Sequence, residues 1–163
     1  MSCYGHRFPV EIINEQDHIF VNESKIRFIC SKIISDAGFR TGRLGVIFTD
    51  NVVIRALNRQ YLKHDNVTNI ISFDLECTDT HLVAELVVST EMVKECYLGC
   101  SWNKESELIL CVIQGVLYHV VCYDNQTEND VRLMRRMEAK YLGILGIVPK
   151  PTENTDHFSD FLP

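Results

Sequence analysis

The sequence predicts a small α/β layered domain, an α+β-like arrangement in which a mixed sheet of about four strands is backed by about four to five helices. Short apolar segments of strand character alternate along the chain with longer segments whose apolar residues recur every three or four positions. The 163 residues, 46% hydrophobic and 23% charged, are typical of one globular domain with a buried core. We expect that domain to span residues 1–148, and residues 149–163 to form a polar, disordered tail.

The amino-terminal part predicts a strand followed by a helix. Val10–Asn14 alternates loosely between apolar and polar residues, as a strand with one buried face does. Asn22 is a candidate N-cap, because its side chain can accept a hydrogen bond from the first turn of a helix. The apolar residues that recur at helical spacing after it are Ile26, Ile29, Ile33 and Ile34.

The middle of the chain predicts three more strands and a second helix. Leu44–Thr49 is a short apolar strand, and Asp50 can cap the helix that follows it. The residues expected on one side of that helix are Val53, Ile54, Leu57 and Tyr61. Asn69–Phe73 and Glu85–Ser89 have strand composition and are separated by a polar loop.

The carboxyl-terminal half predicts three helices. Ser89 or Thr90 can cap a helix that ends near Gly99. The segment from Glu105 to about Val121 is strongly apolar and predicts a buried central helix. The last helix runs from Asp130 to Leu145, with its apolar side at Leu133, Met137, Tyr141 and Leu142.

Charge and cysteine content restrict the function classes. The net charge of −6 argues against a broad nucleic-acid surface, because sequence-independent binding to phosphates needs clustered cations, so any RNA contact must be local. The seven cysteines are an odd number without a Cys-x-x-Cys pair, which disfavours disulfide partners and a cysteine-ligated zinc. We therefore expect reduced thiols and a cytoplasmic protein. We expect neither a secretory signal nor a membrane partner.

The segment from Gln114 to Asn125 is the most informative, and it reads Gln-Gly-Val-Leu-Tyr-His-Val-Val-Cys-Tyr-Asp-Asn. It resembles the metal motif of the YbeY family of single-strand-specific endoribonucleases, His-Gly-x-Leu-His-x-x-Gly-Tyr-Asp-His, in which Asp replaces the last His in some branches. Aligned from the left, Gln114 and Tyr118 stand at the first two His positions. Aligned from the right, His119 stands at the second His position and Asn125 at the last. The two alignments differ by one extra residue near Tyr118.

The resemblance extends over roughly residues 10–148. The family's Leu-Asn-x-x-Tyr/Phe and Asp-x-Pro-Thr-Asp/Asn-Val-Leu-Ser-Phe blocks resemble Leu57–Tyr61 and Asp65–Phe73. Its Gly-Asp/Glu-Ile/Val-x-Ile/Val-Ser strand resembles Ala84–Ser89, and the helix after its motif resembles the segment with Leu133–Arg135 and Glu138. The order and spacing of these blocks are more specific than any one of them.

This resemblance implies a zinc-dependent endoribonuclease that acts on single-stranded RNA in ribosomal RNA maturation and ribosome biogenesis. It implies a Zn²⁺ ion at the carboxyl end of the motif helix, held by His119, by Asn125 or Asp124, and by a third group. Gln114 would be a poor substitute for that third group, because zinc prefers imidazole, thiolate and carboxylate ligands. No residue is assigned as the catalytic base.

The same resemblance implies where RNA and ribosomal particles would bind. It places a groove along the strands at residues 68–73 and 85–89, with the preceding loop beside the RNA. The RNA-contacting residues that it implies are Lys63, His64 and Thr68. Without the resemblance, Thr68 and its neighbours would be ordinary loop residues.

The extra residue near Tyr118 determines which side chains of the motif can face one metal ion. Residues four apart on an α-helix differ by about 40° in direction, and residues five apart by about 140°. Gln114 and His119 are five apart, so both can face one ion only if a π-bulge absorbs the extra residue. A buried His in an apolar helix is more often a hydrogen-bonded core residue than a ligand, and Cys122 is more often a buried thiol than a thiolate ligand.

A second hypothesis remains open beside the hydrolase. Gln114 and Tyr118 replace two imidazoles, so the chain could be a non-catalytic relative that binds RNA or ribosomal particles without metal. A metalloprotease is a weaker hypothesis, because His-Glu-x-x-His does not occur in the sequence.

Overall fold

The computed structural model describes residues 7–63, 68–96, 103–120 and 127–148, with the backbone alone at Glu95, Cys96 and His119. In chain order the elements are β1 Val10–Asn14, α1 Glu23–Asp36, β2 Thr41–Thr49, α2 Asn51–Leu57, the π-helical turn η1 Asn58–Leu62, β3 Ile70–Cys77, β4 His81–Ser89, α3 Thr90–Cys96, α4 Lys104–Gly115, the π-helical turn η2 Val116–Val120 and α5 Glu128–Ile144. Residues 149–163 lie outside the described ranges, so the division into domain and tail stays a prediction.

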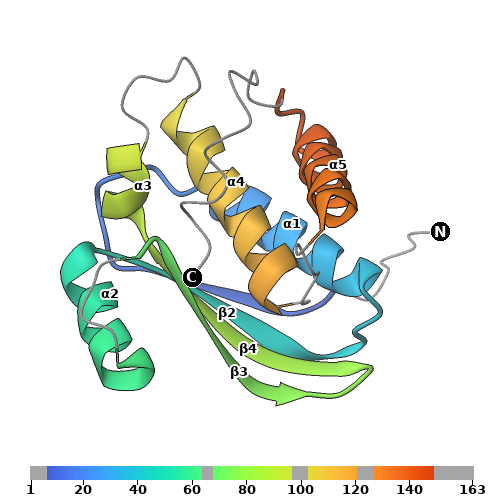
Figure 1. The fold of residues 1–163 in the computed structure, drawn as a ribbon, viewed down its shortest axis with the longest axis horizontal. Coiled ribbons are helices and arrows are strands. Elements are labelled where there is room, and N and C mark those ends of the chain that lie inside the picture. The colour runs from blue at the N-terminus through green and yellow to red at the C-terminus, as the bar shows by residue number, and fades with distance from the viewer. Residues whose placement is uncertain (1–6, 64–67, 97–102, 121–126, 149–163) are drawn as a thin grey trace.

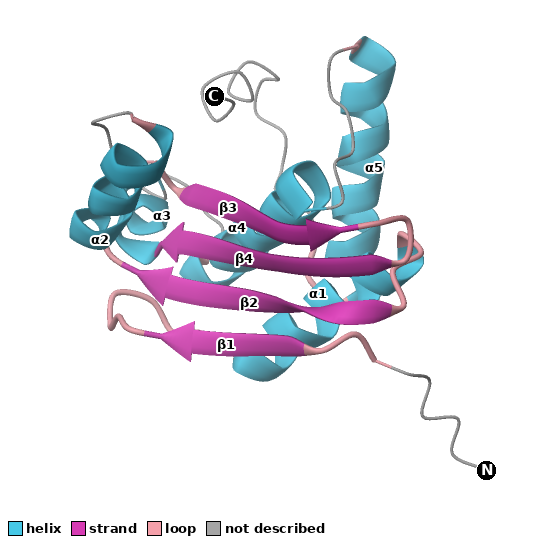
Figure 2. Cartoon of the chain, turned by 90° about the horizontal axis from the view of Figure 1, so that it is seen from below, coloured by secondary structure: helices cyan, strands magenta, loops and turns pink. Residues whose placement is uncertain are grey.

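The sheet has four strands in the order β1-β2-β4-β3. The pairs β1–β2 and β2–β4 are parallel. The pair β3–β4 is antiparallel, and β3 is an edge strand. The helices α1, α4 and α5 lie over one face of this sheet (Figure 1), and the view onto the other face shows the four strands in front of them (Figure 2). The mixed sheet and its helices confirm the predicted fold class.

Alternate residues along the strands point to opposite faces of the sheet and belong to two separate apolar clusters. Phe48 and Leu86 point into the main core, where α1 and α4 cover the sheet, and both are fully buried. Val87 and Ile71 point the opposite way and pack with Ile54 of α2 in a smaller cluster. The helix α2 therefore covers one end of the sheet face that the other helices leave open.

Side-chain caps start most of the helices, as the sequence predicts for α1 and α2. Asp50 Oδ1 accepts a hydrogen bond from the Val53 N–H at 3.0 Å, and Ser89 Oγ accepts one from the Met92 N–H at 3.3 Å. The capping residues of α1, α2, α4 and α5 are Asn22, Asp50, Asn103 and Thr127. The predicted end of α3 near Gly99 lies outside the described residues.

Three strands are longer than predicted. β2 begins at Thr41, where it pairs with His81 of β4, and β3 continues to Cys77, which pairs with Leu82. The residues added to β2 and β3 are mostly polar and exposed, whereas β4 begins at His81 and gains the buried residues Leu82 and Ala84. An apolar pattern detects only the buried part of strands such as β2 and β3.

Two helix faces differ from the prediction. Tyr61 was expected on the buried side of the helix after Asp50, but α2 ends at Leu57 and the π-helical turn leaves Tyr61 58% exposed. In α5, Leu133 is exposed and Met134 is buried in its place. No helix in the described part of the chain is long and apolar enough to cross a membrane.

Candidate functional site

The motif helix is the most deeply buried helix of the molecule. Asn103 caps it, α4 runs to Gly115, and the same rod continues as η2 from Val116 to Val120. Val116 and Leu117 are fully buried, so this turn belongs to the core. The main core lies between α4 and the sheet (Figure 1).

The π-helical turn lies where the sequence requires one extra residue to be absorbed, and it confirms the predicted bulge near Tyr118. A turn closed between residues i and i+5 holds one residue more than an α-helical turn. The five-residue step from Gln114 to His119 therefore completes about one turn of backbone. The chain keeps the frame of the motif helix despite its added residue.

Gly115 fixes how closely this helix approaches the sheet. A Cβ atom at this position would lie 2.3 Å from Ile70 Cδ1 of β3 and 3.2 Å from Leu86 Cδ2 of β4. Ile70 begins β3, the edge strand that follows the Thr68 loop. Glycine at this motif position thus brings the carboxyl end of the helix against the start of β3.

Gln114 and Tyr118, at the first two His positions of the motif, both contact Glu138 of α5. The Gln114 amide donates to Glu138 Oε1 at 3.3 Å, and the Tyr118 hydroxyl donates to the same oxygen at 3.5 Å. Both bonds are long, and the Glu138 residue is only 7% exposed. We call Gln114, Tyr118 and Glu138 the Glu138 cluster.

Burial sets the protonation of the Glu138 cluster. It raises the pKa of Glu138 to about 7, although the hydrogen bonds from Gln114 and Tyr118 and the charge of Arg135 oppose this shift. Burial, and then the charge and hydrogen bond of Glu138, also raises the pKa of Tyr118 well above its usual range. Tyr118 is therefore a neutral hydrogen-bond donor, whereas Glu138 changes from protonated to ionised near pH 7.

The described part of the motif does not fit zinc. An amide and a neutral phenol are poor zinc ligands, and here both are engaged by a carboxylate. Within the described ranges, no group of three or more His, Cys, Asp and Glu side chains could hold a metal. In the Glu138 cluster, Gln114 and Tyr118 both donate to the same carboxylate oxygen of Glu138.

The remaining metal predictions fall beyond what the structure describes. His119 lies in η2, but only its backbone is described. Asp124, Asn125 and Cys122 lie outside the described residues. The assignment of His119, Asp124 and Asn125 as ligands stays a prediction, and Gln114 is the one candidate whose side chain has a described partner.

The structure describes two of the three residues that were predicted to contact RNA. Lys63 is exposed at the end of η1, and its left-handed backbone has φ 56°. Thr68 is half-buried, and its hydroxyl donates to the Ile70 carbonyl at 3.5 Å. His64 lies outside the described residues. The described ends of the loop that joins η1 to β3 are therefore the exposed Lys63 and the half-buried Thr68, which precedes the edge strand β3.

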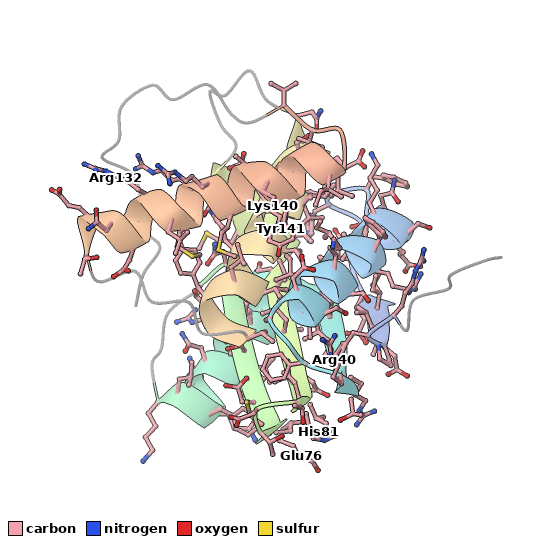
Figure 3. All side chains as sticks on the ribbon, turned by 90° about the vertical axis from the view of Figure 1, so that its right-hand side faces the viewer. Arg40, Glu76, His81, Arg132, Lys140 and Tyr141 are labelled. Atoms are coloured by element: carbon pink, nitrogen blue, oxygen red, sulfur yellow. The ribbon has the colours of Figure 1, made fainter. Side chains whose placement is uncertain are left out.

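Sequence reasoning missed the role of Glu138. The signal was an acidic residue on the apolar side of α5, four residues after Met134 and three before Tyr141, both of which are buried. Tyr141 anchors this helix to α1, because its hydroxyl donates to Asp36 Oδ2 at 2.9 Å (Figure 3). A buried carboxylate on a helix fixed in this way needs donors from its neighbour, and α4 and η2 supply them.

Comparison with known proteins identifies the family. The model of the family described as Endoribonuclease YbeY matches residues 11–146. A relative named Endoribonuclease YbeY from Carboxydothermus hydrogenoformans is 30% identical over 141 residues, covering 84% of this chain and 97% of its own. One from Flavobacterium psychrophilum, with the same name, is 32% identical over 147 residues, covering 90% and 98%.

A solved structure supports the fold alone. The solution structure of TM1509 from Thermotoga maritima superposes with a TM-score of 0.55 at 20% identity, covering 91% of this chain and 98% of that one. The family match spans all the described strands and the motif helix. The chain therefore belongs to the YbeY family of endoribonucleases, the family that its motif resembles.

Proposed function

We propose that this protein is an endoribonuclease that cuts single-stranded RNA in ribosomal RNA maturation, with ribosomal particles as its partners and the cytoplasm as its compartment. The observation that carries the proposal is the family match over residues 11–146. Curated relatives across several bacterial lineages bear the name Endoribonuclease YbeY, which supports RNA as the substrate class. The seven cysteines without a Cys-x-x-Cys pair support a reducing compartment.

The packing of the motif helix supports the same proposal. Gly115 holds the carboxyl end of the helix against β3, and η2 restores the spacing between Gln114 and His119. In our proposal His119, with Asn125 or Asp124, holds a Zn²⁺ ion. When bound, such an ion supplies a water of lowered pKa for attack on a phosphodiester. Gln114 and Tyr118 take no part in holding it, because both are bonded to Glu138.

The test of this proposal combines elemental analysis with a cleavage assay. Purified protein should contain one zinc per chain, and His119→Ala should lose it without unfolding. Wild-type protein should cut an unstructured RNA oligomer, and a chelator should stop the reaction. Gln114→Ala should keep its zinc, because this residue is not a ligand in the proposal. Full zinc content in His119→Ala would contradict the ligand assignment.

The second candidate function is a non-catalytic family member that binds RNA or ribosomal particles without metal. The Glu138 cluster favours it, because the two positions that carry His in the motif are satisfied within the protein. Zinc-free protein that binds single-stranded RNA and leaves it intact, with and without added zinc, would establish this function over the first. Zinc-dependent cleavage would exclude it.

A further inference from the structure

The π-helical turn η1 displays an aromatic side chain on the surface. Asn58, its first residue, is only 4% exposed and attaches the turn to the body of the protein. In the same turn, Tyr61 is 58% exposed and Leu62 is 47% exposed. The turn therefore presents an aromatic and an aliphatic side chain to solvent at adjacent positions.

The ring of Tyr61 is held in place by a second aromatic residue. Phe73 of β3 lies with its ring centroid 5.4 Å from that of Tyr61, and the two planes meet at 76°. This edge-to-face geometry is a favourable one for aromatic pairs. Phe73 in turn packs against the small apolar cluster of Ile54, Ile71 and Val87. The Tyr61 ring is therefore oriented by a supported neighbour while much of its surface stays open to solvent.

Lys63 ends the same turn with a constrained backbone. Its φ of 56° is left-handed, which is uncommon for a residue with a side chain and costs free energy. The Lys63 N–H donates to the Asn58 carbonyl and closes the turn, which holds this conformation. An exposed lysine thus follows an exposed tyrosine by two residues, in a protein whose net charge is −6.

This surface and the motif helix both adjoin the edge strand β3, from opposite faces of the sheet. Ile70, whose side chain limits the approach of Gly115, is three residues before Phe73 on β3. Three residues of a strand span about 10 Å. Because β3 is the edge strand of the described sheet, the path from the face that carries Tyr61 to the face that α4 covers runs around β3 without crossing another strand. A short single strand of nucleic acid can therefore reach from one to the other.

We propose that Tyr61, supported by Phe73, stacks on one base of single-stranded RNA, and that Lys63 contacts a phosphate next to that base. The inference rests on the proposed function, in that it takes RNA to be the ligand. Sequence-tolerant single-strand binding commonly combines aromatic rings for the bases with cations for the backbone. In a duplex the bases are already stacked on each other, so this surface selects unpaired strands.

The experiment measures binding of a fluorescent single-stranded RNA oligomer and of an abasic oligomer of the same length. Tyr61→Ala should bind the RNA about tenfold more weakly, since one base–aromatic stack is lost. Tyr61→Phe and Tyr61→Trp should bind as wild type does. On the abasic oligomer, Tyr61→Ala and wild type should bind equally, because no base is present to stack.

Two further variants separate stacking from charge and from general exposure. Phe20→Ala removes another exposed aromatic ring, 71% exposed and located before α1, and should leave RNA binding unchanged. Lys63→Ala should weaken binding to both oligomers and reduce its dependence on salt, because the phosphate contact does not depend on bases. Circular dichroism and thermal unfolding check that each variant is folded.

The outcomes distinguish this inference from the proposed function. If wild-type protein binds no single-stranded RNA, both fail. If wild-type protein binds RNA and Tyr61→Ala binds it equally well, the stacking surface is wrong and the proposed function stands. An equal loss on RNA and abasic strands in Tyr61→Ala would also overturn stacking. Preferential loss on RNA, restored by Tyr61→Trp, supports it.

Discussion

The two π-helical turns in the described part of the chain differ in their surroundings. Each follows an α-helix without interruption, η1 after α2 and η2 after α4. Leu117 of η2 is fully buried, whereas Leu62 of η1 is 47% exposed. The Tyr118 hydroxyl of η2 donates a hydrogen bond to a buried carboxylate. The ring of Tyr61 in η1 instead packs edge-to-face against another aromatic ring.

The difference shows that a π-helical turn does not determine a function by itself. In η2 the turn absorbs one residue and keeps the motif helix in register with the core, where the Glu138 cluster joins it to α5. In η1 the turn rotates its last residues out of the apolar stripe and displays them beside an edge strand. We infer that η2 holds the motif helix, with His119 on it, in place within the core, and that η1 forms a contact surface for RNA.

The largest expected difference between the two turns is in core stability. Leu117→Ala removes a fully buried side chain and should lower the free energy of unfolding by about 3 kcal/mol. Leu62→Ala, the matched change in η1, should alter it by less than about 0.5 kcal/mol. Urea denaturation of the two variants measures both values. Similar losses in the two variants would remove the contrast between the turns.

The second difference is in pH dependence. The pKa of Glu138 is raised from 4.5 to about 7, so the folded protein binds this proton more tightly than the unfolded chain. The resulting stabilisation is fully present below about pH 4.5 and is lost as the pH rises through 7, on the order of 3 kcal/mol in all. Glu138→Gln cannot titrate, so its stability relative to wild type should increase over this window. If the free energies of unfolding of the two proteins changed with pH in the same way, the raised pKa of Glu138 would be wrong.

A third difference concerns close packing at the start of η2. Gly115→Ala places a methyl group 2.3 Å from Ile70 Cδ1 and should cost about 1–3 kcal/mol. Gly143→Ala is the matched control in α5, where a new Cβ has no neighbour within 4 Å. Because alanine favours helix over glycine, that control should gain about 0.5–1 kcal/mol. A gain in both variants, measured by thermal unfolding, would show that β3 can move away from the helix.

The smallest difference tests the two tyrosine hydroxyl groups. Tyr118→Phe removes the bond to Glu138 and should cost about 1 kcal/mol, and it should raise the pKa of Glu138 further. Tyr61→Phe should leave stability unchanged within about 0.3 kcal/mol, since that hydroxyl is on an exposed ring. Denaturation at pH 6 and pH 8 measures both effects. Equal stability of Tyr118→Phe and wild type at both pH values would show that the 3.5 Å bond contributes nothing.

The sequence predicts most of the fold because its signals are local. Strand β1 has the predicted bounds, Asn22 and Asp50 cap as predicted, and the π-helical turn near Tyr118 follows from one extra residue in a known spacing. The lengths of β2 and β3 could not be predicted in full, because their outer residues pair through backbone groups that any side chain allows. The start of β4 was missed although Leu82 and Ala84 alternate as buried residues, so there the signal was present in the sequence.

The site is less predictable because it depends on contacts between elements. Gln114 and Glu138 are 24 residues apart, and only the packing of α5 on α4 brings them together. The prediction that Tyr61 lies on the apolar side of the helix was wrong because it assumed a regular α-helix. The π-helical turn η1 has more residues per turn, which changes the direction of this side chain. Local patterns therefore identify the motif helix, whereas the partners of its side chains come from tertiary structure.

Backbone hydrogen exchange with and without a single-stranded RNA oligomer tests the central contrast most directly. If η1 is a contact surface and η2 a structural turn, RNA should slow exchange at the amides of residues 58–63. Exchange at residues 116–120, already slow in the buried helix, should stay the same. Slower exchange at residues 116–120 with no change at residues 58–63 would contradict the account.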